Sequence, residues 1–330
     1  MKEIVARAPT RIDFGGGWTD VPPYSEERGG FVCNAAVDLH ATVTLSPRGP
    51  GDNSATRAGQ AESALAAAAM RRSGVKDARL SLNAGYPVGA GLGGSSAAGV
   101  AALGALAAWC SRPVDLAELA ESSRALEVED LGVPGGRQDH YAAAYGGALA
   151  LSFTSHTTVR QIPLSAARRR ELEEKCLIVY TGQSRISGET ITAVMDAYRG
   201  RNRRVLEALD RMRSLAEAMA RVLEEGDLDD LGRMVGEHWI YQRSLHPAII
   251  TARIDSIMER AARAGALGAK ALGASGGGCV LVMVPSERRQ AVAGALADLG
   301  ELLDARVDTS GLTVRATDFA TRTGNERRAG

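Results

Sequence analysis

A glycine-rich run followed by two serines, Gly89-Ala90-Gly91-Leu92-Gly93-Gly94-Ser95-Ser96-Ala97, is the clearest chemical signal in the sequence. Closely spaced glycines let backbone N–H groups converge on an anion, and a helix that begins directly after them adds the positive end of its dipole. We expect residues 95–110, nearly all small and apolar, to form that helix. The run therefore predicts a phosphate-binding loop, whose contacts would come from Gly89, Gly91, Leu92, Gly93, Gly94, Ser95, Ser96 and Ala97.

The glycine-rich run is not the common P-loop, because the GxxxxGK[ST] pattern requires a lysine that is absent here. The hydroxyls of Ser95 and Ser96 stand where they could reach a phosphate or a magnesium ion. The alternative is that Gly93 and Gly94 only end a strand and allow a helix to pack tightly. Residues elsewhere in the chain must decide between these interpretations.

The elements that must position this loop alternate between strands and helices in the first half of the chain. A breaker-rich loop at 14–23, with three glycines in a row and two prolines, separates the first two predicted strands. The second half is mainly helical, and a glycine cluster at 273–278 runs into its last predicted strand. The predicted strands are 3–8, 30–45, 78–83, 148–153, 175–180 and 279–284, and the predicted helices are 61–73, 95–110, 114–130, 139–145, 188–225 and 227–264.

The composition argues against several classes of function. The 330 residues are 45% hydrophobic and 24% charged, which allows a sizeable core, and 39 basic side chains balance 39 acidic ones. This balance gives no reason to expect a nucleic acid or an anionic membrane as a partner. The four cysteines form no CxxC pair, and the chain shows no signal-peptide pattern or long apolar span, so we expect a cytoplasmic protein. The five histidines have no metal-binding spacing and are interpreted as ordinary residues.

Three segments together resemble the three motifs of the GHMP kinase family, which includes galactokinase, homoserine kinase, mevalonate kinase and phosphomevalonate kinase. They are Pro9-Thr10-Arg11-Ile12-Asp13 with the loop to Asp20, Gly89 to Ala98, and Leu272 to Gly278. Their order and spacing match, and the resemblance covers nearly the whole chain. It implies an α+β fold of two domains, with residues 1–155 as an N-terminal α/β domain like ribosomal protein S5 that holds the ATP phosphate loop, and residues 156–330 as a ferredoxin-like C-terminal domain.

Within this family, residues 15–24 and 136–147 are most similar to the branch that holds D-glycero-D-manno-heptose 7-phosphate kinases and the kinase part of L-fucokinases. The resemblance implies ATP and Mg²⁺ as cofactors and a small-molecule sugar or sugar phosphate as substrate. It implies phosphorylation of the anomeric C1 hydroxyl of D-glycero-D-manno-heptose 7-phosphate, which gives the 1,7-bisphosphate. A kinase for L-fucose or another free sugar is the first alternative, and a non-catalytic sensor of sugar and nucleotide is the second. Assembly into a homo-oligomer is left open.

The resemblance also implies two catalytic residues. Asp139 would accept or orient the proton of the attacking hydroxyl, and the alternative is that it only caps a helix after the Gly135-Gly136 turn. Arg11 would offset the charge that develops on the transferring phosphoryl group, and the alternative is an exposed arginine on a strand.

A magnesium site is implied at Glu127 and Ser96, which would supply a carboxylate oxygen and a hydroxyl. Glu129 and Asp130 are rivals of Glu127, and any of these acids could instead lie on a solvated helix face. A sensor would have no physical need for a complete phosphoryl-transfer set of Asp139, Glu127, Ser96 and Arg11 together, so the set favours an enzyme.

The loop at 14–23 is expected to form the sugar side of the site. Asp20 could accept hydrogen bonds from sugar hydroxyls or could cap the turn before the two prolines. Gly17 stands where galactokinases carry a glutamate, which speaks against galactose as the substrate. Trp18 stands where heptose-phosphate kinases usually have glycine and fucokinases have tryptophan.

A phosphorylated sugar would need a cation to hold its phosphate. Arg185, Arg243 and Lys270 are the candidates, although such side chains more often lie on the surface. Gly276 and Gly277 are expected to let the backbone approach a bound molecule or the first loop, or else to form a tight turn. The expected substrate-binding residues are therefore Trp18, Asp20, Gly136, Arg185, Arg243, Lys270, Gly276 and Gly277.

Overall fold

The larger of two sheets is built around two long central strands, β1 and β2. The structure is a computed structural model that describes residues 2–48, 60–183 and 188–318. The larger sheet has six strands in the order β10-β1-β2-β4-β5, with β3 paired to β2 outside this path, and every pairing is antiparallel. Its strands are β1 (Lys2–Gly15), β2 (Gly30–Pro47), β3 (Ala78–Ala84), β4 (Ala148–Phe153), β5 (Thr157–Ile162) and β10 (Thr313–Asp318).

The last part of β1 carries polar and apolar side chains in strict alternation. Ile12 and Phe14 are buried in an apolar cluster, whereas Arg11 and Asp13 each directly precede one of them. Successive side chains of a strand point to opposite faces, so Arg11 and Asp13 share the face away from this cluster. The strand therefore brings two charged side chains to one place in the interior.

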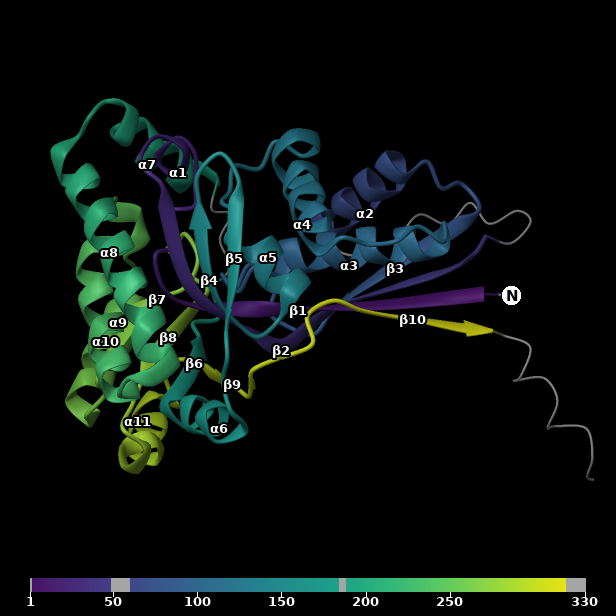
Figure 1. The fold of residues 1–330 in the computed structure, drawn as a ribbon. Coiled ribbons are helices and arrows are strands. Elements are labelled where there is room, and N and C mark those ends of the chain that lie inside the picture. The colour runs from purple at the N-terminus through teal and green to yellow at the C-terminus, as the bar shows by residue number, and fades with distance from the viewer. Residues whose placement is uncertain (1, 49–59, 184–187, 319–330) are drawn as a thin grey trace, which may run out of the picture.

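Helices α2 to α5 cover one face of the larger sheet (Figure 1). Helix α3 consists almost entirely of small residues, so it can be buried between the sheet and the neighbouring helices. A short helix α1 follows the glycine-containing loop, and a π-helical turn η1 continues α4. The bounds are α1 (Tyr24–Glu27), α2 (Gln60–Ser73), α3 (Gly94–Trp109), α4 (Leu116–Ala125), η1 (Leu126–Asp130) and α5 (Gln138–Tyr145).

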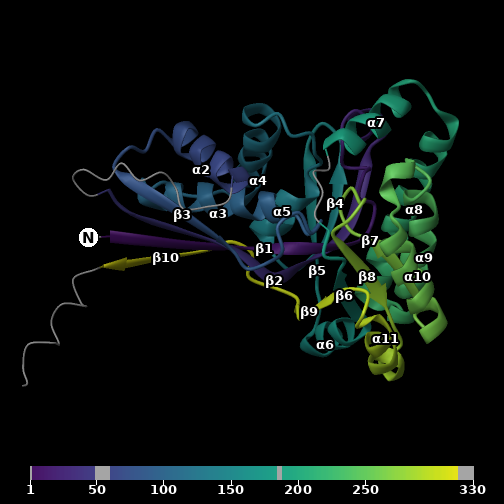
Figure 2. The ribbon, with the colours of Figure 1, turned by 180° about the vertical axis from the view of Figure 1, so that it is seen from behind.

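The second sheet has four antiparallel strands in the order β7-β8-β6-β9. Helices α8, α9 and α10 lie side by side at the end of the molecule opposite to α2 and α3 in both ribbon views (Figures 1 and 2). The side chains of Asn202 and Asp227 cap the first turns of α8 and α9. The strands are β6 (Cys176–Tyr180), β7 (Gly268–Ala271), β8 (Cys279–Met283) and β9 (Glu301–Leu303), and the helices are α6 (Ala166–Lys175), α7 (Gly188–Arg199), α8 (Arg203–Glu225), α9 (Leu228–Gln242), η2 (Pro247–Ile249), α10 (Ala252–Ala264), η3 (Ser286–Arg288) and α11 (Arg289–Leu296).

The two sheets do not separate at a single point of the chain. Strands β5 and β10 both lie beyond residue 155, and both join the larger sheet. The chain therefore builds the larger sheet first, then the smaller sheet, and returns to pair β10 with β1.

Most predicted elements are present, with three kinds of error. The predicted helix 188–225 is divided into α7 and α8 near Gly200, and the predicted helix 227–264 is divided into α9 and α10. The first strand continues to Gly15 instead of ending at residue 8. The short elements α1, α6, β5, β7, β9, α11 and β10 were not predicted.

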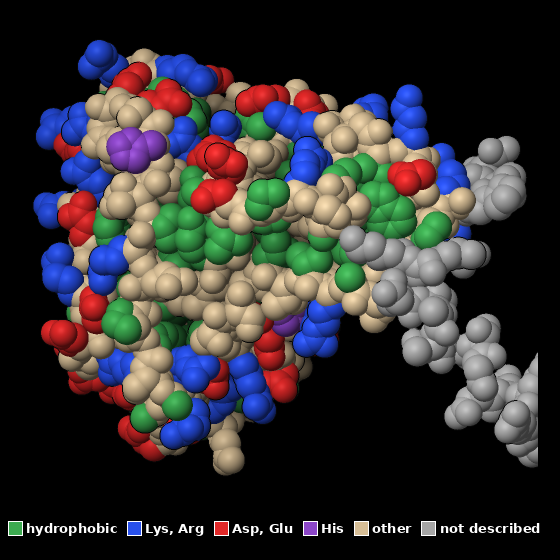
Figure 3. Space-filling view, turned by 45° about the vertical axis from the view of Figure 1, so that its right-hand side comes forward, with side chains coloured by type: hydrophobic (Ala, Val, Ile, Leu, Met, Phe, Trp, Pro, Cys, Tyr) green, Lys and Arg blue, Asp and Glu red, His purple; other side chains and the backbone are tan. Residues whose placement is uncertain are grey.

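The surface has no face of one charge in the view of Figure 3. Hydrophobic side chains gather in a band across the middle of that face, and acidic and basic side chains are mixed above and below it (Figure 3). This mixture agrees with the zero formal net charge. None of the helices in the described ranges is both long enough and apolar enough to cross a membrane.

Candidate active site

A cavity of about 280 Å³ lies where segments from both halves of the chain meet. Its lining comes from the end of β1, the loop after β1, the glycine-rich loop, the start of α5, one residue of α7 and the loop after β7. The lining residues used below are Arg11, Asp13, Gly17, Trp18, Asp20, Tyr86, the run 89–96, Gly136, Gln138, Asp139, Gly273 and Ala274.

The predicted phosphate loop forms one wall of this cavity. Gly89, Gly91 and Gly93 have φ values of 75°, 74° and 74°, in the left-handed region that favours glycine, and they alternate with residues outside that region. Such alternation turns successive N–H groups toward a common point. No side chain caps the start of α3, so its first N–H groups remain available to an anion.

The glycine-rich loop is held by backbone contacts and by one tyrosine. A Cβ atom at Gly91 would lie 2.6 Å from the carbonyl oxygen of Leu272, so the loop and the segment after β7 pack backbone against backbone. The hydroxyl of Tyr86 donates to the carbonyl of Gly94 at 2.5 Å, and its ring occupies the space that a side chain at Gly94 would need. Tyr86 also lines the cavity and was not predicted from the sequence.

Arg11 and Asp139 form a partly buried ion pair beside this loop. Nε and Nη2 of Arg11 donate to the two carboxylate oxygens of Asp139 at 2.7 and 2.8 Å, and Nη1 donates to the carbonyl of Gly91 at 2.6 Å. Arg11 is 3% exposed, so it is not a surface arginine. A Cβ atom at Gly93 would lie 3.0 Å from three atoms of the Asp139 side chain, which places the carboxylate next to the glycine-rich loop.

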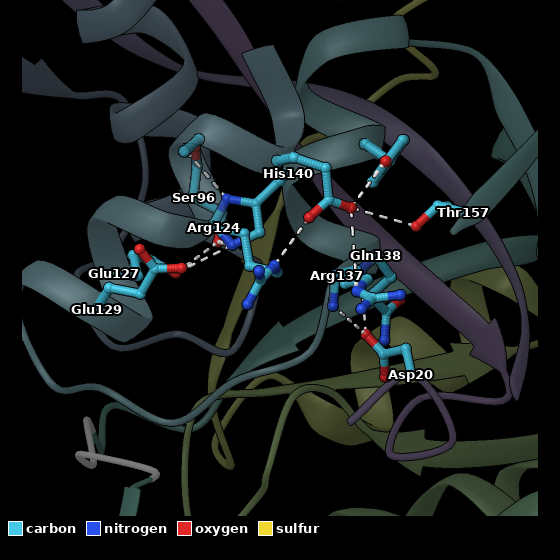
Figure 4. Close-up of polar contacts among 12 residues, drawn as sticks. Asp20, Ser96, Arg124, Glu127, Glu129, Arg137, Gln138, His140 and Thr157 are labelled. Carbon is cyan, nitrogen blue, oxygen red and sulfur yellow. Dashed lines mark hydrogen bonds and ion pairs between the residues drawn. The ribbon is translucent and has the colours of Figure 1, made fainter. Parts of the chain in front are cut away.

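Asp20 caps the helix that carries Asp139, although it lies on a distant loop. Its Oδ2 accepts hydrogen bonds from the backbone N–H groups of Arg137 and Gln138 at 2.8 and 3.0 Å (Figure 4). A Cβ atom at Gly136 would lie 2.0 Å from that oxygen, so a glycine is required there. Burial raises the pKa of Asp20 to about 6, helped by the charges of Asp139 and Asp13 and opposed by the hydrogen bond from Gln138.

Ser96, at the start of α3, contacts Glu127 of the π-helical turn η1. The Ser96 hydroxyl donates to Oε2 of Glu127 at 3.1 Å, and Nε2 of His140 lies 3.2 Å from the same oxygen (Figure 4). Burial alone would raise the pKa of Glu127, but the charge and hydrogen bond of His140 and hydrogen bonds from Ser95 and Ser96 lower it overall. The rival Glu129 is 59% exposed, so the structure separates the two acids.

The oxygen atoms of Glu127 and Ser96 suit a magnesium ion as ligands. Its second oxygen, Oε1, is buried and has no hydrogen-bond partner among the described residues. Those residues contain no cluster of three or more His, Cys, Asp and Glu side chains that could hold a metal. Mg²⁺ usually takes few protein oxygens and completes its shell with phosphates and water. Ser96 and Glu127 fit a metal of that kind.

Several predicted site residues, Glu127 among them, do not line the cavity. Lys270 is fully buried and donates to Oδ2 of Asp13 at 3.0 Å, and Arg243 pairs with Asp255 on α10 at 3.2 Å. The prediction that these two side chains face a substrate phosphate is therefore wrong for the described structure. Arg185 lies outside the described residues.

The residues that line the cavity correct two further predictions. One concerns Gly276 and Gly277 of the second glycine cluster, and the other concerns Ala97 of α3. Gly273 and Ala274 line the cavity, whereas Gly276 and Gly277 do not. The N–H of Gly276 donates to Ile249, and a Cβ at Gly277 would lie 2.8 Å from the carbonyl of Gln183. Ala97, expected at the nucleotide, is buried within α3 and does not line the cavity.

The loop after β1 is shaped by interactions that the sequence did not reveal. A Cβ at Gly16 would lie 1.9 Å from the carbonyl oxygen of Phe31, and the hydroxyl of Thr19 donates to the carbonyls of Gly16 and Phe31 at 2.7 and 3.0 Å. The N–H of Gly16 donates to Nε2 of the buried His238 at 2.9 Å. Trp18 has a φ of 83°, unusual for a residue other than glycine, and its indole Nε1 has no partner among the described residues.

The interpretation of the histidines as ordinary was incomplete. His140 contacts Glu127, and its Nδ1 lies 3.0 Å from the hydroxyl of Ser123. The sequence offers one weak signal, since His140 is a polar residue directly before the apolar stretch of the helix predicted at 139–145.

Two family models match the chain. The model described as GHMP kinases N terminal domain matches residues 60–147, and the model described as GHMP kinases C terminal matches residues 205–302. Together they cover more than half of the chain.

Curated relatives and solved structures resemble the chain over most of its length. A D-glycero-alpha-D-manno-heptose 7-phosphate kinase of Campylobacter jejuni is 27% identical over 88% of this chain and 91% of the relative. A bifunctional fucokinase/GDP-fucose pyrophosphorylase of Arabidopsis thaliana is 26% identical over 83% of this chain, which spans 29% of that larger protein. The crystal structure of a D-glycero-D-manno-heptose 1-phosphate kinase from Bacteriodes thetaiotaomicron superimposes with a TM-score of 0.75 at 24% identity, over 94% of this chain and 98% of that one.

Proposed function

Because the chain belongs to the GHMP kinase family and is a sugar kinase, we propose that it transfers the γ-phosphate of ATP to the anomeric C1 hydroxyl of its sugar. The first candidate substrate is D-glycero-D-manno-heptose 7-phosphate, named in the relative that is similar over nearly its full length. The product would be the 1,7-bisphosphate.

The observation that carries this proposal is the position of Asp139 in the cavity, between the glycine-rich loop and Asp20 on the loop after β1. Its carboxylate lies against Gly93 of the glycine-rich loop, and the helix that carries it begins at the cap provided by Asp20. A nucleotide with its phosphates on the glycine-rich loop would present the γ-phosphate toward this carboxylate. A sugar bound beside Asp20 and Trp18 would present a hydroxyl from the other side.

The two charged residues of the pair have separate roles in the proposed reaction. Asp139 accepts a hydrogen bond from the C1 hydroxyl and orients its oxygen for attack, which matters because phosphoryl transfer depends strongly on positioning. Arg11 fixes both oxygens of that carboxylate and adds positive charge where negative charge develops on the phosphoryl group. Its contact with the carbonyl of Gly91 links the orientation of the acid to the glycine-rich loop.

Ser96 and Glu127 would hold the magnesium ion that accompanies ATP. The ion neutralises charge on the phosphate oxygens when it is bound. His140 fixes Oε2 of Glu127, so the unpartnered Oε1 is the oxygen left for a ligand.

A kinase of a free sugar, such as L-fucose, is the second candidate, and one observation favours it. Of the described residues that line the cavity, Arg11 alone is basic, and it is already bound to Asp139. Lys270 and Arg243 are engaged elsewhere. A substrate phosphate would therefore need a cation from outside this set, and Arg185 is the residue to test.

The test is production of ADP from ATP and Mg²⁺ with D-glycero-D-manno-heptose 7-phosphate, L-fucose, D-galactose or mevalonate, followed by phosphorus NMR of the product. A heptose 1,7-bisphosphate is the expected result. If the wild type accepts heptose 7-phosphate and Arg185→Ala raises its KM without changing the KM for ATP, the phosphate contact is supported. Turnover of a free sugar alone would transfer the assignment to the second candidate, and no turnover with any acceptor would refute the proposed function.

A further inference from the structure

The floor of the sugar side of the cavity is formed by Asp13, a residue without an assigned role so far. Asp13 lies two positions after Arg11 on the same face of β1, lines the cavity and is 4% exposed. Its Oδ2 accepts a hydrogen bond from Lys270, whose side chain is fully buried and does not line the cavity. The lysine therefore balances the charge of Asp13 from outside the lining of the cavity, whereas Asp13 itself is a lining residue.

Gly17 is the residue that leaves this carboxylate open. A Cβ atom at position 17 would lie 2.2 Å from Oδ2 of Asp13 and 2.9 Å from Nε2 of Gln138. Both contacts are shorter than atoms can tolerate, so any side chain at position 17 would displace or cover the carboxylate and the amide. Gly17 has no left-handed φ, so its conformation does not itself require glycine. The requirement comes from the two polar groups next to it, the carboxylate of Asp13 and the amide of Gln138.

The polar groups of this floor have unused hydrogen-bonding capacity. Oδ1 of Asp13 is buried and has no partner among the described residues. Asn34, which pairs with Asp13 across β1 and β2, is fully buried and does not itself line the cavity. Nδ2 of Asn34 donates to Oε1 of Gln138 at 3.4 Å, which holds the amide of Gln138 in place. Buried acceptors without donors are costly, so a ligand rich in hydroxyl groups would be stabilised here.

We propose that Asp13 binds a hydroxyl of the acceptor sugar, that Gly17 keeps its carboxylate accessible, and that Lys270 acts as the positioning residue behind it. This inference rests on the proposed sugar-kinase function and adds a specificity-determining residue to it. Positions 11 and 13 of a strand are separated by about 6.5–7 Å, which is comparable with the span of a pyranose and its hydroxyls. A sugar whose C1 hydroxyl is at Asp139, the partner of Arg11, can therefore reach Asp13 with a more distant hydroxyl.

The position of Gly17 also explains how the site can lack an acidic side chain there. The carboxylate of Asp13 occupies nearly the place where the side chain of residue 17 would begin. The acid thus comes from the strand below the loop instead of from the loop itself. The hydroxyl that it selects is fixed by β1, which at Asp13 pairs with Asn34 of β2.

The experiment compares three variants of the full chain with the wild type. Asp13→Asn combined with Lys270→Met removes the acid without leaving a buried charge unpaired. Gly17→Ala covers the carboxylate of Asp13 and keeps both residues of its ion pair with Lys270. Lys175→Met combined with Asp229→Asn removes a similar partly buried ion pair that does not line the cavity, and serves as the control for loss of stability alone.

We expect the KM for the sugar to rise about 10-fold to 100-fold in the first two variants, because a hydrogen bond to a charged group is lost. The KM for ATP should change by less than about twofold in all three, and the control should keep both values. Thermal unfolding and binding of ATP establish that each variant is folded. Should the Asp13 and Lys270 variant fail to fold, the Gly17→Ala variant carries the test.

Monodeoxy derivatives of whichever sugar the wild type phosphorylates, D-glycero-D-manno-heptose 7-phosphate or L-fucose, identify the contact. One derivative should be equally poor for the wild type and for the Asp13 and Lys270 variant, because the hydroxyl that Asp13 binds is missing from it. An unchanged KM for the sugar, or an equal loss with every derivative, would overturn the inference. A wild type that binds ATP but phosphorylates no sugar would instead refute the proposed function, and binding of L-fucose by the folded variants would then decide the role of Asp13 separately.

Discussion

Arg11 holds both carboxylate oxygens of Asp139 across a separation of 128 positions in the sequence. The two residues come from the first strand and from a helix that follows the π-helical turn, and their contact ties the larger sheet to the catalytic side of the cavity. The pair also touches the glycine-rich loop through Gly91 and Gly93. The orientation of the acid is therefore coupled to the part of the site proposed to hold the phosphates.

Replacement of Asp139 by asparagine or alanine should lower kcat at least ~100-fold, the lower end for a positioned acid or base. The KM for ATP should change little, because the side chain is proposed to act on the sugar hydroxyl. ADP release at saturating ATP and sugar measures the effect, with nucleotide binding as the check on folding. An Asp139→Ala protein as fast as the wild type would refute the catalytic assignment.

Gly93→Ala should lower the rate of ADP release more than about 10-fold, because the new Cβ would lie 3.0 Å from three atoms of the Asp139 side chain. Gly74→Ala is the matched control, since Gly74 has a similar φ of 72° against 74° at Gly93 and nothing within 4 Å of its Cβ position. Both substitutions should cost about 1–2 kcal/mol of stability through backbone strain. Urea unfolding and ADP release on both proteins separate the two effects, and equal losses of activity would contradict the prediction.

The sequence predicted those parts of the site that depend on local pattern. The glycine-rich loop and the buried helix after it follow from residue types that are contiguous in the chain, and the structure has both. The family resemblance implied Arg11 and Asp139 as the two catalytic residues, and the structure brings them into direct contact.

The parts that were not predicted depend on tertiary burial. Lys270 stands in a short strand, and no local signal shows that its ammonium group would be enclosed against Asp13 of β1. Burial lowers the pKa of Lys270, although the charge and the hydrogen bond of Asp13 act in the opposite direction. A lysine exposed to solvent in order to bind a phosphate would not show this effect of burial. Strands β5 and β10 were missed for a similar reason, because their pairing partners lie in the larger sheet while their own residues are largely exposed.

Glu127→Gln should raise the Mg²⁺ concentration needed for half-maximal activity by about 10-fold or more, because an amide oxygen replaces a charged ligand. Glu129→Gln is the matched control on the same π-helical turn, since Glu129 is exposed and lies 3.9 Å from Arg72. Titration of activity with Mg²⁺ at fixed ATP measures the change. An equal response of the two variants would remove Glu127 from the proposed metal site.

The stability of the protein should depend on pH through Asp20. Its pKa is 3.8 in an ordinary environment and about 6 in the folded protein, so between these values the folded state keeps a proton that the unfolded state has lost. The free energy of unfolding should therefore fall as the pH rises through this window, by about 2–3 kcal/mol at most.

Asp20→Asn isolates this effect, because the amide cannot ionise and its oxygen can still accept the hydrogen bonds from Arg137 and Gln138. The variant should gain stability relative to the wild type between about pH 4 and pH 6, and the difference should level off above that range. Urea unfolding of both proteins at a series of pH values measures it, and other titrating groups largely cancel in the comparison. A difference that stays constant, or that favours the wild type as the pH rises, would contradict the prediction. It would show that the hydrogen bonds from the start of α5 offset the effect of burial on the pKa of Asp20.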